Sequence, residues 1–169
     1  MTPLRIGLAV LALGALVLFW STRSSDRRRI ERQLEELQEL ISKDAAETPL
    51  AGLNRARLIT ELFASRFEVR AEQLRFATRD HRELAGFIHG YRRGRDRITM
   101  STAGATLDID PENRRATHRV DLLFTGGGPL GSPSERYRVQ INWFEEEGHW
   151  RIDYIDLIQI LEGGNRLGF

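Results

Sequence analysis

Two ionisable side chains fall on the apolar faces of predicted strands, where an acid and a base could act together on a bound molecule. His118 shares the alternating phase of Val120 in one strand, and Asp156 shares the phase of Ile152 in another. Burial disfavours the charged form of a carboxyl group, so Asp156 on such a face would have a raised pKa and could serve as a base. His118 and Asp156 are therefore the candidate catalytic residues.

Each of these two candidates also has a purely structural interpretation. A half-buried histidine near the end of a sheet can be satisfied by a single hydrogen bond. Ile155 and Leu157 are apolar in the opposite phase, so a register change before them would turn Asp156 outward. The sequence leaves both alternatives open.

Four aromatic residues with large or polar-tipped side chains accompany these candidates. They are Tyr91, Tyr137, Trp143 and Tyr154. Together with the two ionisable residues they form the predicted ligand pocket, although tyrosines on half-buried faces also serve simply as packing. The four histidines show no metal-binding spacing, and the chain has no phosphate-binding glycine loop, so neither a metal nor another cofactor is expected.

A cluster of arginines closes one predicted helix. It comprises Arg92, Arg93, Arg95 and Arg97. Such a cluster could bind a phosphate or anionic lipid headgroups, or it could be a solvated helix end, because cations are favoured at helix C-termini.

The composition excludes several classes of function. The 169 residues carry 25 basic and 24 acidic side chains, a formal net charge of +1, so the basic excess typical of a nucleic-acid-binding protein is missing. The chain contains no cysteine, which excludes disulfides, thiolate nucleophiles and cysteine metal sites.

The N-terminal segment predicts a membrane anchor. Ile6 to Trp20 is uninterrupted apolar sequence, and residues 6–22 lack any charge, which is the lower end of the length that spans a bilayer core. A cleaved secretory signal is the alternative, but its best cleavage site, Thr22-Arg23-Ser24, is poor. We therefore expect a single-pass membrane protein with a short tail at residues 1–5, an anchor at 6–22, a domain at 26–161 and a loose tail at 162–169.

The side of the membrane is a separate expectation. Four arginines closely follow the apolar segment, which favours a cytoplasmic domain by the positive-inside rule. A short basic N-terminus before a short apolar run is instead typical of a bacterial signal-anchor, and on this ground we expect an extracytoplasmic, periplasmic domain.

Three helices are expected in the domain. The first is indicated by apolar residues at spacings of four, three and four, namely Ile30, Leu34, Leu37 and Ile41. Thr48-Pro49 starts a second helix whose apolar face continues to Phe63, and Asp80 with Glu83 forms a capping box that opens a third helix, closed by Gly94.

The remaining pattern is that of strands. An early strand is predicted over Phe67 to Leu74, and four long antiparallel strands follow Arg95. The apolar phase changes around Gly104, which indicates a β-bulge. The last strand is expected to point Trp150, Ile152, Tyr154 and Ile158 inward. The domain is therefore predicted to be α+β.

Two segments carry a resemblance to a known family: Leu58 to Glu72, a helix end with its following strand, and Tyr137 to Leu157, the final hairpin. They and the order of elements over residues 26–161 resemble the nuclear transport factor 2-like superfamily (NTF2-like, including SnoaL-like proteins and ketosteroid isomerase). This resemblance implies a cone in which three helices pack on a strongly curved, mostly antiparallel sheet.

The resemblance also implies two classes of function. Isomerase members use a tyrosine oxyanion hole and a carboxylate base, but the first two predicted helices here contain no tyrosine, so those roles are not carried over. The chain is expected to be a membrane-anchored, non-catalytic module that binds an apolar small molecule or assembles as a homodimer or with a partner protein. The alternative is an isomerase or dehydratase using His118 and Asp156.

Overall fold

The structure is a computed structural model that describes residues 25–127 and 134–162. Within these ranges no helix has the length and apolarity needed to cross a membrane. The predicted anchor at 6–22 lies outside the described residues. So does the predicted C-terminal tail, apart from Glu162, which ends the last strand.

Six strands form one mixed sheet in the order β2-β1-β6-β5-β4-β3. Their bounds are Phe63–Ala71 for β1, Phe76–Thr78 for β2, Arg97–Asp110 for β3, Arg115–Gly127 for β4, Ser134–Glu146 for β5 and His149–Glu162 for β6. All neighbouring strands are antiparallel except β1 and β6, which run parallel, so the first and last strands meet inside the sheet.

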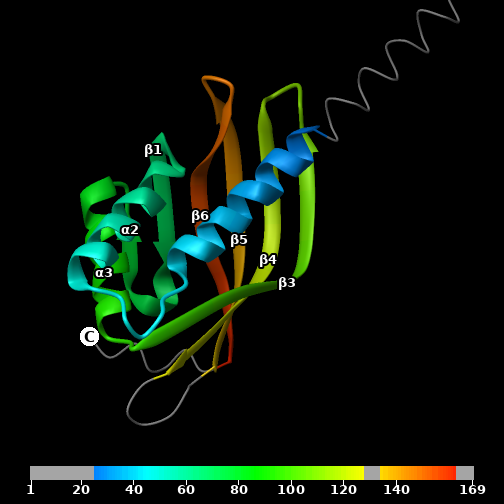
Figure 1. Ribbon diagram of the computed structural model, residues 1–169. Coiled ribbons are helices and arrows are strands. Elements are labelled where there is room, and N and C mark those ends of the chain that lie inside the picture. The colour runs from blue at the N-terminus through cyan, green and yellow to red at the C-terminus, as the bar shows by residue number, and fades with distance from the viewer. Residues whose placement is uncertain (1–24, 128–133, 163–169) are drawn as a thin grey trace, which may run out of the picture.

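The helices cover one face of this sheet. The N-terminal helix is described over residues 25–41, α2 spans Pro49–Glu61, α3 spans His81–Arg93, and a short 3₁₀ turn, Glu72–Leu74, joins β1 to β2. Figure 1 shows the N-terminal helix running diagonally across the strands, with α2 and α3 stacked beside β1. Helices on one face of a largely antiparallel sheet make the domain α+β, as predicted.

The predicted helix starts are confirmed by their caps. The Thr48 hydroxyl accepts a bond from the backbone N–H of Ala51, and the Asp80 carboxylate accepts bonds from Arg82 and Glu83. The return half of the capping box is absent, because the Glu83 side chain accepts the Thr78 hydroxyl instead. These side chains satisfy backbone donors that the first turn leaves free.

Gly104 makes the predicted bulge in β3. Its φ is +60°, and the pairing of β3 with β4 shifts register between Ala103 and Thr106. A positive φ is readily adopted by glycine, and the extra residue changes which side chains face the core. The bulge explains why Met100 and Ile109, on opposite parities, are both buried.

The first strand begins earlier than predicted. The sequence places Phe63 in the second helix and starts the strand at Phe67, but α2 ends at Glu61 and β1 starts at Phe63. The backbone N–H of Ile152 donates to the carbonyl of Leu62, and Phe63 pairs with Ile152. Pairing with β6 therefore overrides the helical pattern of the sequence at Phe63. The short strand β2 was not predicted, because its sequence has no pattern that indicates a strand.

The core lies between the helices and the sheet. The N-terminal helix contributes Ile30, Leu34 and Leu37, which confirms the predicted stripe. Trp143 and Ile152, opposite each other on β5 and β6, are fully buried at its centre. The sheet is thus fixed against the helices by large apolar side chains around a cavity described below.

Candidate functional site: an apolar cavity beneath helix α3

A cavity of about 200 Å³ lies between α3 and the helix-covered face of the sheet. Its wall is almost entirely apolar and is open to solvent on one side. The lining side chains come from the end of the N-terminal helix, from α3, and from β1, β4, β5 and β6; they include Ile41, Val69, Ala71, Phe87, Ile88, Leu122, Phe124, Val139, Ile155 and Leu157. A concave apolar space of this kind is suited to an apolar molecule.

Tyr91 on α3 and Tyr137 on β5, two of the residues predicted to form a ligand pocket, line the same cavity. Their hydroxyl groups turn to Glu135, donating to Oε2 of its carboxylate over 3.2 and 3.1 Å respectively. Burial, with the nearby Glu135 charge second, raises the pKa of both tyrosines well above the usual value. Both hydroxyls therefore stay protonated and remain hydrogen-bond donors.

Glu135 is almost fully buried, with 2% of its surface exposed, and is held entirely within the fold. A guanidinium nitrogen of Arg95 lies 2.7 Å from its Oε1, while the two tyrosines occupy Oε2. The Arg95 guanidinium also stacks 3.9 Å from the centre of the Tyr91 ring. With three donors on one carboxylate, the cluster braces one end of the cavity and compensates the buried charge.

Arg92 forms another part of the cavity wall. It belongs to the arginine cluster for which the sequence left open an anion-binding site or a solvated helix end. Only 1% of its surface is exposed. Its guanidinium pairs with Glu47 and donates to the carbonyls of Leu40, Ile41 and Ser42, the last residues of the N-terminal helix and the one after it. The interpretation of the cluster as wholly solvated is thus wrong for Arg92, whose charge satisfies orphan carbonyls at a helix end.

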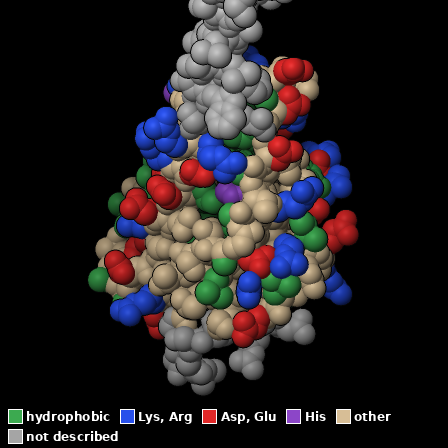
Figure 2. Space-filling view, turned by 90° about the vertical axis from the view of Figure 1, so that its right-hand side faces the viewer, with side chains coloured by type: hydrophobic (Ala, Val, Ile, Leu, Met, Phe, Trp, Pro, Cys, Tyr) green, Lys and Arg blue, Asp and Glu red, His purple; other side chains and the backbone are tan. Residues whose placement is uncertain are grey.

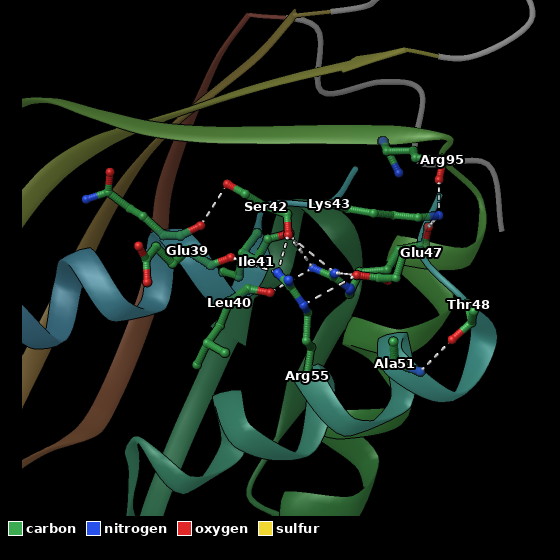
Figure 3. A network of polar contacts seen from close by, with 12 residues as sticks. Glu39, Leu40, Ile41, Ser42, Lys43, Glu47, Thr48, Ala51, Arg55 and Arg95 are labelled. Carbon is green, nitrogen blue, oxygen red and sulfur yellow. Dashed lines mark hydrogen bonds and ion pairs between the residues drawn. The ribbon is translucent and has the colours of Figure 1, made fainter. Parts of the chain in front are cut away.

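A lysine strengthens this junction. The Lys43 ammonium donates to the carbonyls of Arg92 and Arg95, and its backbone pairs with Ile98 at the start of β3. Figure 3 shows Lys43 extended toward Arg95, with Glu47 near the chain that leaves the N-terminal helix. The end of the N-terminal helix and the end of α3 are therefore bound to one another beside the cavity.

His118 is buried, with 2% of its surface exposed, but it does not line the apolar cavity. It lies on β4 opposite Leu107 of β3, in a different pocket beneath the N-terminal helix. Its Nδ1 atom is buried without a hydrogen-bond partner, and burial lowers its pKa from the usual value. The ring is therefore neutral near pH 7.

Asp156 lies on the opposite face of the sheet from His118. His118 on β4 lies opposite Ile141 on the neighbouring strand β5, and Ile141 lies opposite Ile155 on β6. These three residues therefore share the face on which Ile155 lines the cavity. Asp156 instead pairs with Gln140. Directly paired residues share a face and neighbours along a strand alternate, so the two candidate catalytic side chains do not converge.

Register shifts within the β5–β6 hairpin cause this placement. One shift leaves Asp153 of β6 unpaired, between the pairs Trp143–Ile152 and Asn142–Tyr154. Immediately beyond this shift, the residues of β6 that face the core are odd-numbered and no longer even-numbered. Tyr154 consequently faces outward, where the guanidinium of Arg70 lies 5.9 Å from its ring centre. The expectation that Tyr154 and Asp156 point inward is therefore corrected, and the register-change alternative holds.

Two further expectations are settled by burial. Ile158 was expected to point inward, but 42% of its surface is exposed. Another register shift lies between Leu157 and Gln159, so Ile158 has no paired residue on β5. Trp143 is fully buried in the core and does not line the cavity. Of the six predicted pocket residues, the cavity thus brings together only Tyr91 and Tyr137.

Glu135 and Arg92 are the site residues that sequence reasoning missed. Glu135 shares the odd phase of Tyr137 and Val139 in β5, so its inward position had a signal that its charge concealed. Arg92 had no comparable signal, because its partners are backbone carbonyls distant in the sequence. Among the described residues, no group of His, Asp and Glu side chains could hold a metal ion.

Comparisons with known proteins identify the fold and no more. No protein-family model and no curated protein sequence matches the chain. A putative scytalone dehydratase from Novosphingobium aromaticivorans has a similar structure, with a TM-score of 0.63 and 15% identity over 84% of this chain and 90% of that one. The association domain of CaMKII from C. elegans has a TM-score of 0.59 and 14% identity over 79% of this chain and 95% of that one.

A protein of unknown function from Mycobacterium tuberculosis is also similar, with a TM-score of 0.63 and 16% identity over 83% of this chain and 74% of that one. These likenesses support the predicted NTF2-like, SnoaL-like fold. One fold hosts many functions, so identities this low transfer no activity to this chain.

Proposed function

We propose that this protein is a non-catalytic module that binds a small apolar molecule in the cavity beneath α3. The observation that carries this proposal is the nearly complete apolarity of the cavity wall. The two tyrosine hydroxyls beside it are already paired within the fold, since Tyr91 and Tyr137 donate to Glu135. Such a wall offers apolar contacts but no polar partner that would compensate the desolvation of a charged molecule, so it excludes charged ligands.

The size of the cavity indicates the size of its ligand. A cavity of about 150 Å³ lined by apolar side chains remains free of water and binds benzene. The cavity of this chain, about 200 Å³, has room for a molecule of similar or slightly larger size, or for the end of a longer apolar group that protrudes through the open side. Its affinity would come from apolar burial, about 25 cal/mol per Å².

The isomerase or dehydratase alternative is less well supported. The putative scytalone dehydratase supports it through fold alone. An acid and a base must both reach the reacting molecule, whereas His118 and Asp156 lie on opposite faces of the sheet. An enzyme here would need other residues in those roles.

Protein assembly is the second candidate, and the likeness to an association domain favours it. The sheet face that the helices do not cover is available for a second copy or a partner protein. On that face Asp121 is held by Arg136 and Arg138 at 2.8 Å each. An assembly role is compatible with ligand binding, because the cavity lies on the other face.

The proposal also includes location. Residues 6–22 would anchor the chain in a bilayer, with the domain on the extracytoplasmic side. Fusions of a reporter that is active on only one side of the membrane, placed after residue 162, would test this part separately. Activity of a cytoplasm-specific reporter would overturn the orientation, and release of the chain by a high-salt wash would overturn the anchor.

The ligand proposal is tested by native mass spectrometry of the full chain purified in mild detergent from its own host. We expect a species heavier than the chain by the mass of one small apolar molecule, which organic extraction then identifies. An unliganded chain that also fails to take up benzene or toluene in solution would refute the proposal. A ligand-free dimer would favour the assembly function.

A further inference from the structure

A second pocket, of about 230 Å³, opens between the N-terminal helix and the β3–β4 hairpin. None of its lining residues lines the apolar cavity, so it is a separate site. Its floor is formed by His118 of β4 together with Leu34 and Leu107, and its rim carries polar and charged side chains. Figure 2 shows this side of the molecule, where acidic and basic side chains lie close together.

The floor of this pocket contains an unsatisfied polar atom. His118 is 2% exposed, and its Nδ1 has no hydrogen-bond partner. A buried nitrogen without a partner costs free energy, and most such atoms in proteins are bonded to the protein, to water or to a ligand. Since burial lowers the pKa of this histidine, its neutral ring offers one nitrogen as an acceptor.

The charge at the rim is negative. Glu31 and Glu35 are one turn apart on the N-terminal helix and both line the pocket. Arg27 lies 3.5 Å from Glu31 and also donates to the carbonyl of Leu107 over 3.1 Å, so its charge is engaged. Among the described residues Glu35 forms no ion pair, which leaves one carboxylate uncompensated beside the pocket.

We propose that this pocket binds the primary ammonium group of a small organic amine. An ammonium group has three N–H donors and no acceptor, and the residues that line the pocket include three with acceptor groups, His118, Glu35 and Gln38. A short alkyl group would contact Leu34 and Leu107. An anion would meet the Glu35 charge, and a metal ion would find no adequate set of ligands among the described residues.

The test uses the full chain in detergent micelles with ¹⁵N-labelled histidine, and it follows the side-chain resonances of each histidine by NMR. The probes are n-butylammonium, the neutral 1-butanol and the anionic butyrate, which share one alkyl chain. We expect n-butylammonium to shift the His118 resonances in a saturable way, with little effect from the other two. His89 is the internal control, because its Nδ1 is also buried and unpartnered but it does not line this pocket.

Two variants of the N-terminal helix show whether the charge matters. Glu35→Gln should weaken n-butylammonium binding about two- to fivefold, the range measured for charge pairs near a surface. Glu36→Gln is the matched control, since Glu36 is exposed and does not line the pocket, and it should change nothing. The proposal is wrong if no probe gives a saturable shift, if 1-butanol acts as strongly as n-butylammonium, or if both variants behave alike.

Discussion

Replacement of Ala71 by leucine should stabilise the ligand-free chain by filling part of the apolar cavity. Ala71 lies in β1, is 8% exposed and lines the cavity of about 200 Å³. The change adds three carbon atoms. At about 0.8 kcal/mol for each buried CH₂ group, their complete burial in free space would raise the free energy of unfolding by about 2 kcal/mol.

Urea unfolding of ligand-stripped protein measures this gain. Trp143 and Trp150 are buried, so their fluorescence reports loss of the core. The same variant should lose the apolar molecule seen by native mass spectrometry, because its side chain occupies the space of the ligand. Gain of stability together with loss of binding is the signature of a cavity that was free to be filled.

Ala64→Leu is the matched control in the same strand. Ala64 is 2% exposed but does not line the cavity, so added atoms there must displace packed neighbours. That variant should lose about 1–3 kcal/mol, the usual cost of overpacking. If Ala71→Leu is destabilised as much as Ala64→Leu, the space beneath α3 cannot accept added atoms, and the argument for a ligand there fails.

Three further predictions concern the surrounding fold. Arg92→Met should lower the free energy of unfolding by about 3 kcal/mol, because it leaves Glu47 and the helix-end carbonyls without their main donor. In a double-mutant cycle measured by urea unfolding, adding Glu47→Gln should recover part of this loss. Burial lowers the pKa of His118 in the folded state, so its contribution to stability is complete above about pH 6.5 and is lost as the pH falls through the folded-state pKa. His118→Gln should therefore flatten the dependence of the urea midpoint on pH in this range. An unchanged slope would contradict the lowered pKa of His118. Gly104→Ala should cost about 1–2 kcal/mol in thermal or urea unfolding through its positive φ alone, since no atom lies within 4 Å of the added Cβ, whereas Gly86→Ala in α3 should not destabilise the chain.

The sequence predicted those features that depend on local chemistry. Thr48 and Asp80 mark helix starts because their side chains bond to backbone groups within three residues, and Gly104 marks a bulge because glycine readily takes a positive φ. In each case the residue type is enough to predict the local backbone conformation.

The features it missed depend on distant partners. The shift at Asp153 involves neither glycine nor proline, and only the pairing with β5 reveals that Tyr154 and Asp156 turn outward. Burial of Arg92 likewise depends on carbonyls about 50 positions earlier in the chain. A pattern of alternating polarity carries no information of this kind, so the candidate acid and base were predicted on one face and found on two.

The parallel contact between β1 and β6 determines when the sheet can be completed. Among the described strands the first in sequence pairs with the last, and Val69 lies opposite Ile155. During synthesis β1 can pair with β2, but its other edge has no partner until β6 has emerged from the ribosome. Contacts of such long sequence separation slow folding. A chain that stopped short of β6 would not merely lose an edge strand: it would be divided through the middle of its sheet, with β1 and β2 on one side and the β3–β5 meander on the other.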